Sequence, residues 1–330
     1  MTLGAGRGGT RTPVTIRRTG RRGPGAGVII RRVSDHAPRI GRRTLLAGLA
    51  ATPLLGACGN DAPAAPRRPP RDETAPRTER MAYGGQPDQF GELTFPASRD
   101  LPRGTVIVVH GGFWRAGTDL TIMRPVVDAL VAADFAVWNI EYRKVGAGGG
   151  WPSTFDDVAM AADHLATLRS TRLDLRRLVV LGHSAGGHLA GWLAMRATLA
   201  PGDPGATPVV RPAGVVSLAG VLDLAGGMLL GDGAVADLVA ATPGADPARF
   251  RATSPLEAVP LGVPSVCVHG TADEVVPLSQ SEDFVAAATA AGDRSELVRV
   301  EGANHLQLID VAHPGWAAAL QAVERLSAPA

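Results

Sequence analysis

Residues 178–190 read LVVLGHSAGGHLA and are the segment most indicative of the architecture. Its apolar residues are typical of a strand, and Gly182, Ser184 and Gly186 follow in the spacing G-x-S-x-G before a run of small residues typical of a helix. Glycine on either side of the serine permits a turn tight enough to raise the hydroxyl clear of the sheet at a helix N-terminus. The pattern therefore predicts a strand, a nucleophilic Ser184 and a helix, with a purely structural turn as the alternative.

Short β-branched runs alternate with longer Ala- and Leu-rich segments on both sides of this stretch. The alternation is typical of crossover units around a mostly parallel sheet, and near-continuous apolar runs indicate strands covered on both faces. We expect one α/β domain over residues 81–330, with an antiparallel edge strand at 92–95. The central strands are predicted at residues 105–109, 136–140, 178–181, 214–218, 265–269 and 296–300.

Two helices of this domain are predicted from apolar residues that recur at helical spacing. One follows Ser153 and continues to Leu168, and the other contains Trp316 and Val323. Ser153 and Asp156 resemble a capping box at the start of the first helix. The last helix is expected to pack on the sheet.

A serine hydroxyl is a weak nucleophile at neutral pH, so a base must accept its proton and an acid must orient that base. Asp273 in GTADEVVP follows the strand predicted at 265–269 and is the expected acid, because a carboxylate at the carboxyl end of a parallel strand faces the ligand crevice. Asp223 in AGVLDL is the rival, and Glu274 is less well placed. His305 in EGANHLQL follows the last strand and is the predicted base.

The other histidines of the domain are expected to pack, to brace loops or to lie on the surface. A histidine beside two glycines is a possible metal ligand, but no second ligand lies at suitable spacing, so the sequence predicts no metal and no cofactor. These structural histidines are His110, His164, His183, His188, His269 and His313.

The segment HGGFWRAG, residues 110–117, follows the strand predicted at 105–109. A loop in this position supplies an oxyanion donor, and its glycines leave backbone N–H groups accessible. Amides of this loop and of the residue after the nucleophile are expected to converge on the oxyanion, each contributing about 3 kcal/mol of transition-state stabilisation. The predicted oxyanion hole consists of Gly111, Gly112, Phe113 and Ala185.

These elements, in this order, resemble the α/β-hydrolase superfamily over almost all of residues 81–330. HGGFW together with GHSAGGHLA is similar to the bacterial feruloyl-esterase-like (BD-FAE-like) hydrolases and to the kynurenine formamidases. Both groups use a Ser/Asp/His mechanism, but one cleaves an ester and the other a formamide. The resemblance implies an α/β-hydrolase fold with a small cap, and it places Ser184, Asp273 and His305 at the positions of the triad.

The segment EYRKVGAGGGWPSTFDDV, residues 141–158, is also similar to this group. Arg143 is expected to pair with Asp157 and to fix the loop beneath the oxyanion hole. Residues 222–263 are expected to contribute a small cap over the acyl site. The substrate pocket is assigned to Trp114, Trp151, Met228 and Leu229.

The sequence thus favours a serine carboxylesterase that hydrolyses small acyl esters through an acyl-enzyme. Arylformamidase activity is the first alternative, although only 2 Tyr and no evident anchor for an amino-acid head group weaken it. A catalytically silent binding or scaffold protein on the same fold is an alternative from another class. A prolyl-oligopeptidase-like peptidase normally carries a propeller, which the N-terminal residues cannot supply.

Charge is divided unevenly along the chain. The net charge of +2 excludes a polyanion binder driven by bulk charge, so no nucleic-acid partner is predicted. Residues 1–80 hold 16 Arg and 5 acids, a net charge of +11, whereas residues 81–330 hold 17 basic and 26 acidic residues, a net charge of −9. Two Cys exclude a disulfide framework.

The N-terminal residues resemble an export signal. Arg42 and Arg43 precede an uncharged stretch, residues 44–57, that is too short to span a bilayer, and Leu-Gly-Ala-Cys ends it. Paired arginines are similar to a twin-arginine signal, and the last four residues are similar to a lipobox. We therefore expect a leader at 1–57, lipidation at Cys58 as the membrane contact, and a Pro-rich tether at 58–80.

This leader predicts an exported bacterial cell-envelope lipoprotein, and a cytoplasmic location if the leader is misread. Residues 1–35 hold more Arg and Gly than an export signal needs. We therefore expect translation to begin further along, at Val28 or Val33.

Overall fold

The computed structural model describes residues 75–98 and 100–329. The predicted leader, Cys58 and nearly all of the predicted tether lie outside the described residues. None of the described helices is long and apolar enough to cross a membrane.

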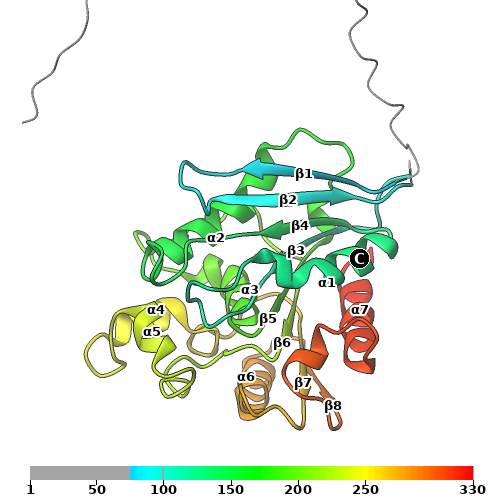
Figure 1. Ribbon diagram of the computed structural model, residues 1–330. Helices are drawn as coiled ribbons and strands as arrows, with labels where there is room; N and C mark the ends of the chain where they lie inside the picture. Colours follow the sequence, from blue (N-terminus) through cyan, green and yellow to red (C-terminus); the bar gives the residue numbers. More distant parts are fainter. Residues whose placement is uncertain (1–74, 99, 330) are drawn as a thin grey trace, which may run out of the picture. The chain divides into compact units, whose positions relative to one another are not determined.

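Eight strands form one sheet in the order β1-β2-β4-β3-β5-β6-β7-β8, and Figure 1 shows helices on both of its faces. Strands β3 to β8 are parallel, and β1 and β2 are antiparallel to their neighbours. The strands are β1 (Arg77–Ala82), β2 (Phe90–Phe95), β3 (Thr105–Val109), β4 (Ala136–Ile140), β5 (Leu178–His183), β6 (Gly214–Leu218), β7 (Ser265–Gly270) and β8 (Ser295–Val300). We call the edge where the parallel strands begin the amino edge, and the edge where they end the carboxyl edge.

The central strands are buried on both faces, which explains their continuous apolar sequences. The helices are α1 (Arg124–Ala132), α2 (Ser153–His164), α3 (Ala185–Met195), α4 (Ala234–Val239), α5 (Pro247–Thr253), α6 (Ser279–Ala290) and α7 (Pro314–Leu326). In β3, Val106 and Val108 pack against α1 and α7, whereas Ile107 and Val109 pack on the other face against α2 and α3. The predicted α/β-hydrolase architecture is confirmed.

The folded domain begins earlier than the sequence predicted. Strand β1 starts at Arg77, ahead of the boundary at Met81, and pairs with β2 so that Arg77 lies opposite Phe95. The predicted edge strand is therefore an internal strand. The Pro-rich composition of the preceding residues concealed β1, whose burial is low because it forms the true edge of the sheet.

The predicted capping box of α2 is absent from the described structure. Pro152 occupies the N-cap position, and no side chain caps the helix. Thr154 instead accepts a hydrogen bond from the Gly150 amide at 2.9 Å and donates one to the Arg143 carbonyl at 2.6 Å. The helix start is thus fixed by the loop before it, a contact that the i, i+3 spacing does not reveal.

Residues 222–263 connect β6 to β7 and contain α4, α5 and the short 3₁₀ turn η5 (Pro255–Ala258). Leu224, Val235, Leu238 and Phe250 anchor this segment to the core. It occupies the region in which the sequence predicted a cap.

Candidate active site

Ser184 lies at the sharp turn between β5 and α3. Its φ of 57° and ψ of −121° are unusual for a residue with a side chain, and such conformations persist where the surroundings enforce them. A Cβ on Gly182 would overlap the carbonyl of Gly186, and a Cβ on Gly186 would overlap the carbonyl of Val109. Both glycines of G-x-S-x-G are therefore required by close backbone approach, as the sequence predicted.

His305 and Asp273 are joined by a hydrogen bond of 2.7 Å between Nδ1 and Oδ2. His305 follows β8 and precedes the 3₁₀ turn η6 (Leu306–Leu308), and Asp273 follows β7. An ionised carboxylate only accepts hydrogen bonds, so Nδ1 of His305 carries the proton and Nε2 is left with a free lone pair. This is the tautomer that a general base requires.

The carboxyl group of Asp273 is fully buried and well satisfied. Its Oδ1 accepts the amides of Val275 and Val276, each at 2.9 Å, and Nε2 of His269 lies 3.5 Å from Oδ2. Burial alone would raise the pKa of Asp273, but the hydrogen bonds from His269, His305 and the Val276 amide outweigh it and lower the pKa well below its usual range. Asp273 is therefore held in the ionised form.

His183, the last residue of β5, links that strand to the loop that carries His305. Its Nε2 donates to the carbonyl oxygen of His305 at 2.9 Å, and the centroids of the two rings are 4.5 Å apart. Burial, together with the nearby His305, lowers the pKa of His183 to about 3, so this side chain is neutral. The structure thus brings His305 against the residue that directly precedes Ser184.

The rival acids lie elsewhere. The backbone of Asp223 exchanges two hydrogen bonds with the Gln280 side chain, at 2.8 and 3.1 Å, and no described residue donates a hydrogen bond to its carboxylate. Glu274 is exposed. Of the three candidates, the structure pairs only Asp273 with His305.

The loop at 110–117 lies against the turn at Ser184. A Cβ on Gly111 would meet the His183 carbonyl at 2.9 Å and the Cβ of Ser184 at 3.0 Å. Gly112 and Phe113 have φ values of 109° and 52°. No described residue accepts a hydrogen bond from the amide of Gly112 or Phe113.

Ala185 is the first residue of α3, and the first amides of a helix have no partner within the helix. Amides from the loop and from the helix start are thus available on either side of Ser184. This arrangement is suited to binding a developing oxyanion.

A buried cluster of charged side chains, Glu141 and Lys144, contacts His110 at the start of the loop at 110–117. Nε2 of His110 lies 2.9 Å from Oε1 of Glu141, and Nζ of Lys144 donates to the same oxygen at 2.6 Å. The ring of His110 stacks on Tyr142 with centroids 4.4 Å apart, and the Tyr142 hydroxyl donates to the His110 carbonyl at 3.0 Å. The bracing role predicted for His110 agrees with these contacts.

Sequence reasoning missed Glu141. Burial would raise the pKa of this carboxyl, but the hydrogen bond and the charge of His110, with the hydrogen bond from Lys144, lower it to about 2. The available signal was a charged run, EYRK, directly after the apolar strand β4.

Arg143 and Asp157 form the predicted pair. The guanidinium donates from Nε and Nη2 to the two carboxylate oxygens at 2.8 and 2.7 Å. Asp157 is fully buried and also accepts from the side chain of Gln89 at 2.6 Å. Val145, two residues after Arg143, donates its amide to the Trp114 carbonyl at 2.8 Å, which connects this pair to the loop at 110–117.

The residues assigned to a substrate pocket have different environments. Trp114 is only 1% exposed, and its indole N–H lies 3.1 Å from both the Ala185 carbonyl and Nδ1 of His188. It packs in the core, which corrects the predicted pocket role. Leu229 is 93% exposed, whereas Trp151 and Met228 are half-buried against the core. The presence of a tryptophan in the sequence does not show whether its side chain packs in the core or lines a substrate pocket.

His188 completes the support beneath the nucleophile's helix. Its Nδ1 accepts from Trp114, so its Nε2 carries the proton and donates to the Thr253 carbonyl at 2.8 Å. Burial lowers the pKa of His188 to about 4. This histidine is neutral and structural, as the sequence predicted.

Arg115 connects the loop at 110–117 to the predicted cap, a role that sequence reasoning missed. Its guanidinium donates to the carbonyl of Gly231 at 2.7 Å and to that of Asp232 at 2.9 Å, and Nε donates to the Asp237 carboxylate at 3.1 Å. A Cβ on Gly231 would overlap the ring of Phe113. The predicted cap, within residues 222–263, is therefore held directly against the loop at 110–117.

Within the described residues, no group of three or more His, Cys, Asp or Glu side chains is placed to hold a metal ion. All chemically relevant groups instead gather at the carboxyl edge, after β3, β5, β7 and β8. A serine at the turn after the central strand, with a His–Asp pair after the last two strands, defines an α/β hydrolase.

The chain belongs to the BD-FAE family, whose sequence model matches residues 92–287. Esterase LipC of Mycobacterium tuberculosis is 29% identical over 274 residues, which cover 77% of this chain and 67% of LipC.

Solved structures of esterases share the fold. The bifunctional GH43-CE protein of Bacteroides eggerthii superposes with a TM-score of 0.65 at 20% identity, over 78% of this chain and 36% of that protein, so this chain spans about a third of its length. Esterase 2 of Thermogutta terrifontis superposes with a TM-score of 0.61 at 23% identity, over 75% of this chain and 90% of that one. The family and its named relatives support a carboxylic ester hydrolase.

Proposed function

We propose that this protein is a serine carboxylesterase that hydrolyses small acyl esters, with Ser184 as nucleophile, His305 as general base and Asp273 as the acid that orients the base. The observation that carries the proposal is the 2.7 Å hydrogen bond between His305 and the buried, ionised Asp273, on a loop held against the Ser184 turn by His183. Membership of the BD-FAE family supports the ester as substrate class.

The reaction uses two acyl transfers. His305 Nε2 accepts the proton of the Ser184 hydroxyl as its oxygen attacks the acyl carbonyl, and the amides of Gly112 or Phe113 and of Ala185 stabilise the oxyanion. The C–O bond of the ester then breaks, and His305 returns the proton to the leaving alcohol. Water, deprotonated by His305, attacks the acyl-enzyme and releases the carboxylic acid and free Ser184.

The preference for a small acyl group is argued from the cap. Arg115 holds the backbone at Gly231 and Asp232, and Gly231 packs closely on the ring of Phe113. This contact brings the cap close to the oxyanion donors. We expect it to leave little room for a long acyl chain beside Ser184.

The test is turnover of a short-chain aryl ester and of N-formylkynurenine by the full chain, with Ser184→Ala as the blank. Dominant ester turnover that falls by roughly 10⁴-fold or more in the mutant supports the esterase and its nucleophile. Dominant formamide turnover would make the protein an arylformamidase instead. Turnover of neither substrate above the blank would favour a binding or scaffold role.

We also propose that the protein is exported and anchored through lipid on Cys58. The motif that supports this proposal is the paired arginines followed by Leu-Gly-Ala-Cys. Mass spectrometry of the protein from its native host would find a mature chain that begins at a diacylated Cys58. A chain that begins upstream of Cys58 and remains unmodified would refute the anchor.

A further inference from the structure

The amino edge of the sheet carries two adjoining grooves rich in arginine. The first, of about 780 Å³, lies over the starts of β6 to β8, and the second, of about 590 Å³, lies beside the segment that leads into β5. Arg176 and Arg177 line both grooves, which makes them continuous. Together the grooves hold six arginines against two acids, Asp174 and Glu296, and the arginines are Arg172, Arg176, Arg177, Arg211, Arg294 and Arg325.

The positive charge gathered in these grooves is opposite in sign to the net charge of the domain. Residues 81–330 have a net charge of −9, and six of their 17 basic residues lie in these two grooves. Arg176 forms only a long contact of 3.4 Å with Asp174 and is 92% exposed. Arg211 and Arg294 are exposed, and no described carboxylate pairs with either. Arg325 instead pairs with Glu296 at 2.7 Å, and Arg177 lies 3.5 Å from Asp174. The charges of Arg176, Arg211 and Arg294 are therefore the ones available to an anionic partner.

Two exposed apolar side chains accompany the arginines. Leu101 is 73% exposed and Val209 is 71% exposed, and both line the second groove. Arginines intermixed with protruding apolar side chains are typical of surfaces that rest on a membrane, where the charges meet phosphate headgroups and the apolar groups enter the acyl boundary. A soluble acidic partner would account for the charges but would not call for Leu101 and Val209.

The entry point of the chain lies at the same edge. Strand β1 begins at Arg77 opposite Phe95, and Thr94 lies opposite Val137, one residue from the start of β4. The segment that precedes the domain therefore joins it at the amino edge. Because residues 1–80 carry a net charge of +11, that segment is not the occupant of an arginine-lined surface.

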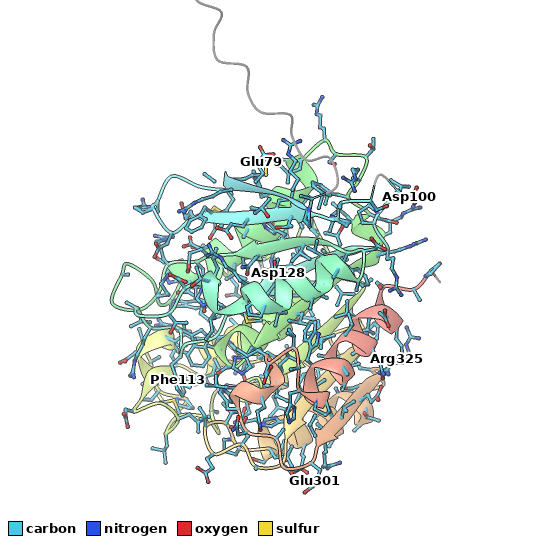
Figure 2. The ribbon with its side chains drawn as sticks, turned by 45° about the vertical axis from the view of Figure 1, so that its right-hand side comes forward. Glu79, Asp100, Phe113, Asp128, Glu301 and Arg325 are labelled. Carbon is cyan, nitrogen blue, oxygen red and sulfur yellow. The ribbon has the colours of Figure 1, made fainter. Side chains whose placement is uncertain are left out.

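We propose that the surface lined by these two grooves, which we call the arginine face, binds the anionic headgroups of a phospholipid membrane. Figure 2 shows Arg325 of this face and Phe113 of the oxyanion loop on opposite sides of the molecule. A domain resting on its arginine face would direct the carboxyl edge, with Ser184, away from the lipid. The proposal is independent of the identity of the ester substrate.

The experiment is co-sedimentation of the full chain with vesicles of phosphatidylglycerol and phosphatidylcholine, and with vesicles of phosphatidylcholine alone. The triple variant Arg176→Gln, Arg211→Gln, Arg294→Gln removes three exposed charges from the arginine face. The matched control, Arg124→Gln, Arg251→Gln, Arg299→Gln, removes three charges outside it. The N-terminal residues contribute equally to all three proteins.

We expect the first triple variant to lower partitioning onto anionic vesicles on the order of 100-fold at low salt, and the control to lower it much less. Ester turnover should remain unchanged in both, which verifies that they fold. Equal losses in both triple variants, or no loss in the first, would overturn the proposal.

Hydrogen exchange locates the contact even where the N-terminal arginines also bind lipid. Anionic vesicles should protect peptides covering residues 169–177 and 209–213. Protection of the same peptides by inorganic phosphate but not by vesicles would show a site for a free anion and overturn the membrane surface. Protection only at the carboxyl edge would place the lipid contact at the active site and also overturn it.

Discussion

The side chain of His183 donates a hydrogen bond to the backbone carbonyl of His305, so the residue before the nucleophile holds the residue proposed as its base. Both residues are buried, and the hydrogen bond joins the end of β5 to the loop after β8. The relative position of Ser184 and His305, the proposed nucleophile and base, therefore depends on a side chain to which the proposed mechanism assigns no chemical step.

Replacing His183 tests this dependence. We expect His183→Ala to lower kcat by about 10-fold to 100-fold and the free energy of unfolding by about 1 to 3 kcal/mol, because a buried carbonyl loses its donor. Steady-state kinetics and urea unfolding measure the two effects. His183→Gln, which can still donate, should recover part of kcat; an alanine variant with normal kcat would show that the loop holds itself in place.

The acid of the triad is distinguished by a pair of conservative variants. Asp273→Asn should lower kcat on the order of 10⁴-fold, because the amide no longer favours the His305 tautomer with the proton on Nδ1. Asp223→Asn should retain most of the activity, since no described histidine donates a hydrogen bond to the carboxylate of Asp223, whose backbone bonds to Gln280. The reverse ranking of the two variants would reassign the acid to Asp223.

Stability should depend on pH through Glu141. Its pKa in the folded protein is about 2, below its value in an unfolded chain, so the unfolded state binds a proton more readily as the pH falls. The stabilisation is present above about pH 4.5 and is lost between about pH 4.5 and pH 2, a total of about 3 kcal/mol. Chemical unfolding at pH 7 and pH 3 measures about 2 kcal/mol of this loss, which is completed only near pH 2. Glu141→Gln should be less stable at pH 7 and show a smaller pH dependence.

The Arg143–Asp157 pair should matter for folding more than for catalysis. Arg143→Ala leaves a fully buried carboxylate without its main partner, and this should cost about 3 to 5 kcal/mol of unfolding free energy. Thermal or urea unfolding provides the measurement. A variant as stable and as active as the parent would mean that Gln89 and the loop amides satisfy Asp157 without the arginine.

The Arg115 clamp should influence which acyl chains are accepted. In Arg115→Gln the cap loses its anchor at Gly231, Asp232 and Asp237, and we expect kcat/KM for a longer acyl ester to rise several-fold relative to that for a short one. Arg251→Gln, on α5 in the same segment, is the matched control. If the dependence of kcat/KM on acyl-chain length is unchanged in Arg115→Gln, the contact of the cap with Arg115 does not determine which acyl chains are accepted.

Sequence reasoning located the strands and the chemical groups because their signals are local. The strand predictions at 105–109, 136–140 and 214–218 coincide with β3, β4 and β6, since doubly buried strands need continuous apolar runs. The G-x-S-x-G turn is recognisable from a five-residue pattern, although only Gly182 is required by a nearby residue, Gly186, whereas Gly186 is required by the distant backbone of Val109.

Features that depend on contacts between distant segments were not predictable in this way. The residues of the edge strand β1 are mostly exposed and show no apolar run, and the strand forms because its backbone pairs with β2. Glu141 and Arg115 act through His110 and the cap, which lie far from them in sequence. Trp114 has the composition of a pocket residue, and only its two hydrogen-bond partners reveal that it is core.

The close approach of Gly186 to the backbone of Val109 and His110 has a consequence for any attempt to change the specificity of this protein. The helix start that presents Ser184 and the strand end that leads into the oxyanion loop share one van der Waals contact without a side chain between them. Neither can be shifted without shifting the other, so the Ser184 turn and the start of the 110–117 loop form a single rigid unit. A wider substrate range is therefore expected to depend on the contact of Arg115 with Gly231 and Asp232, which lies outside that unit.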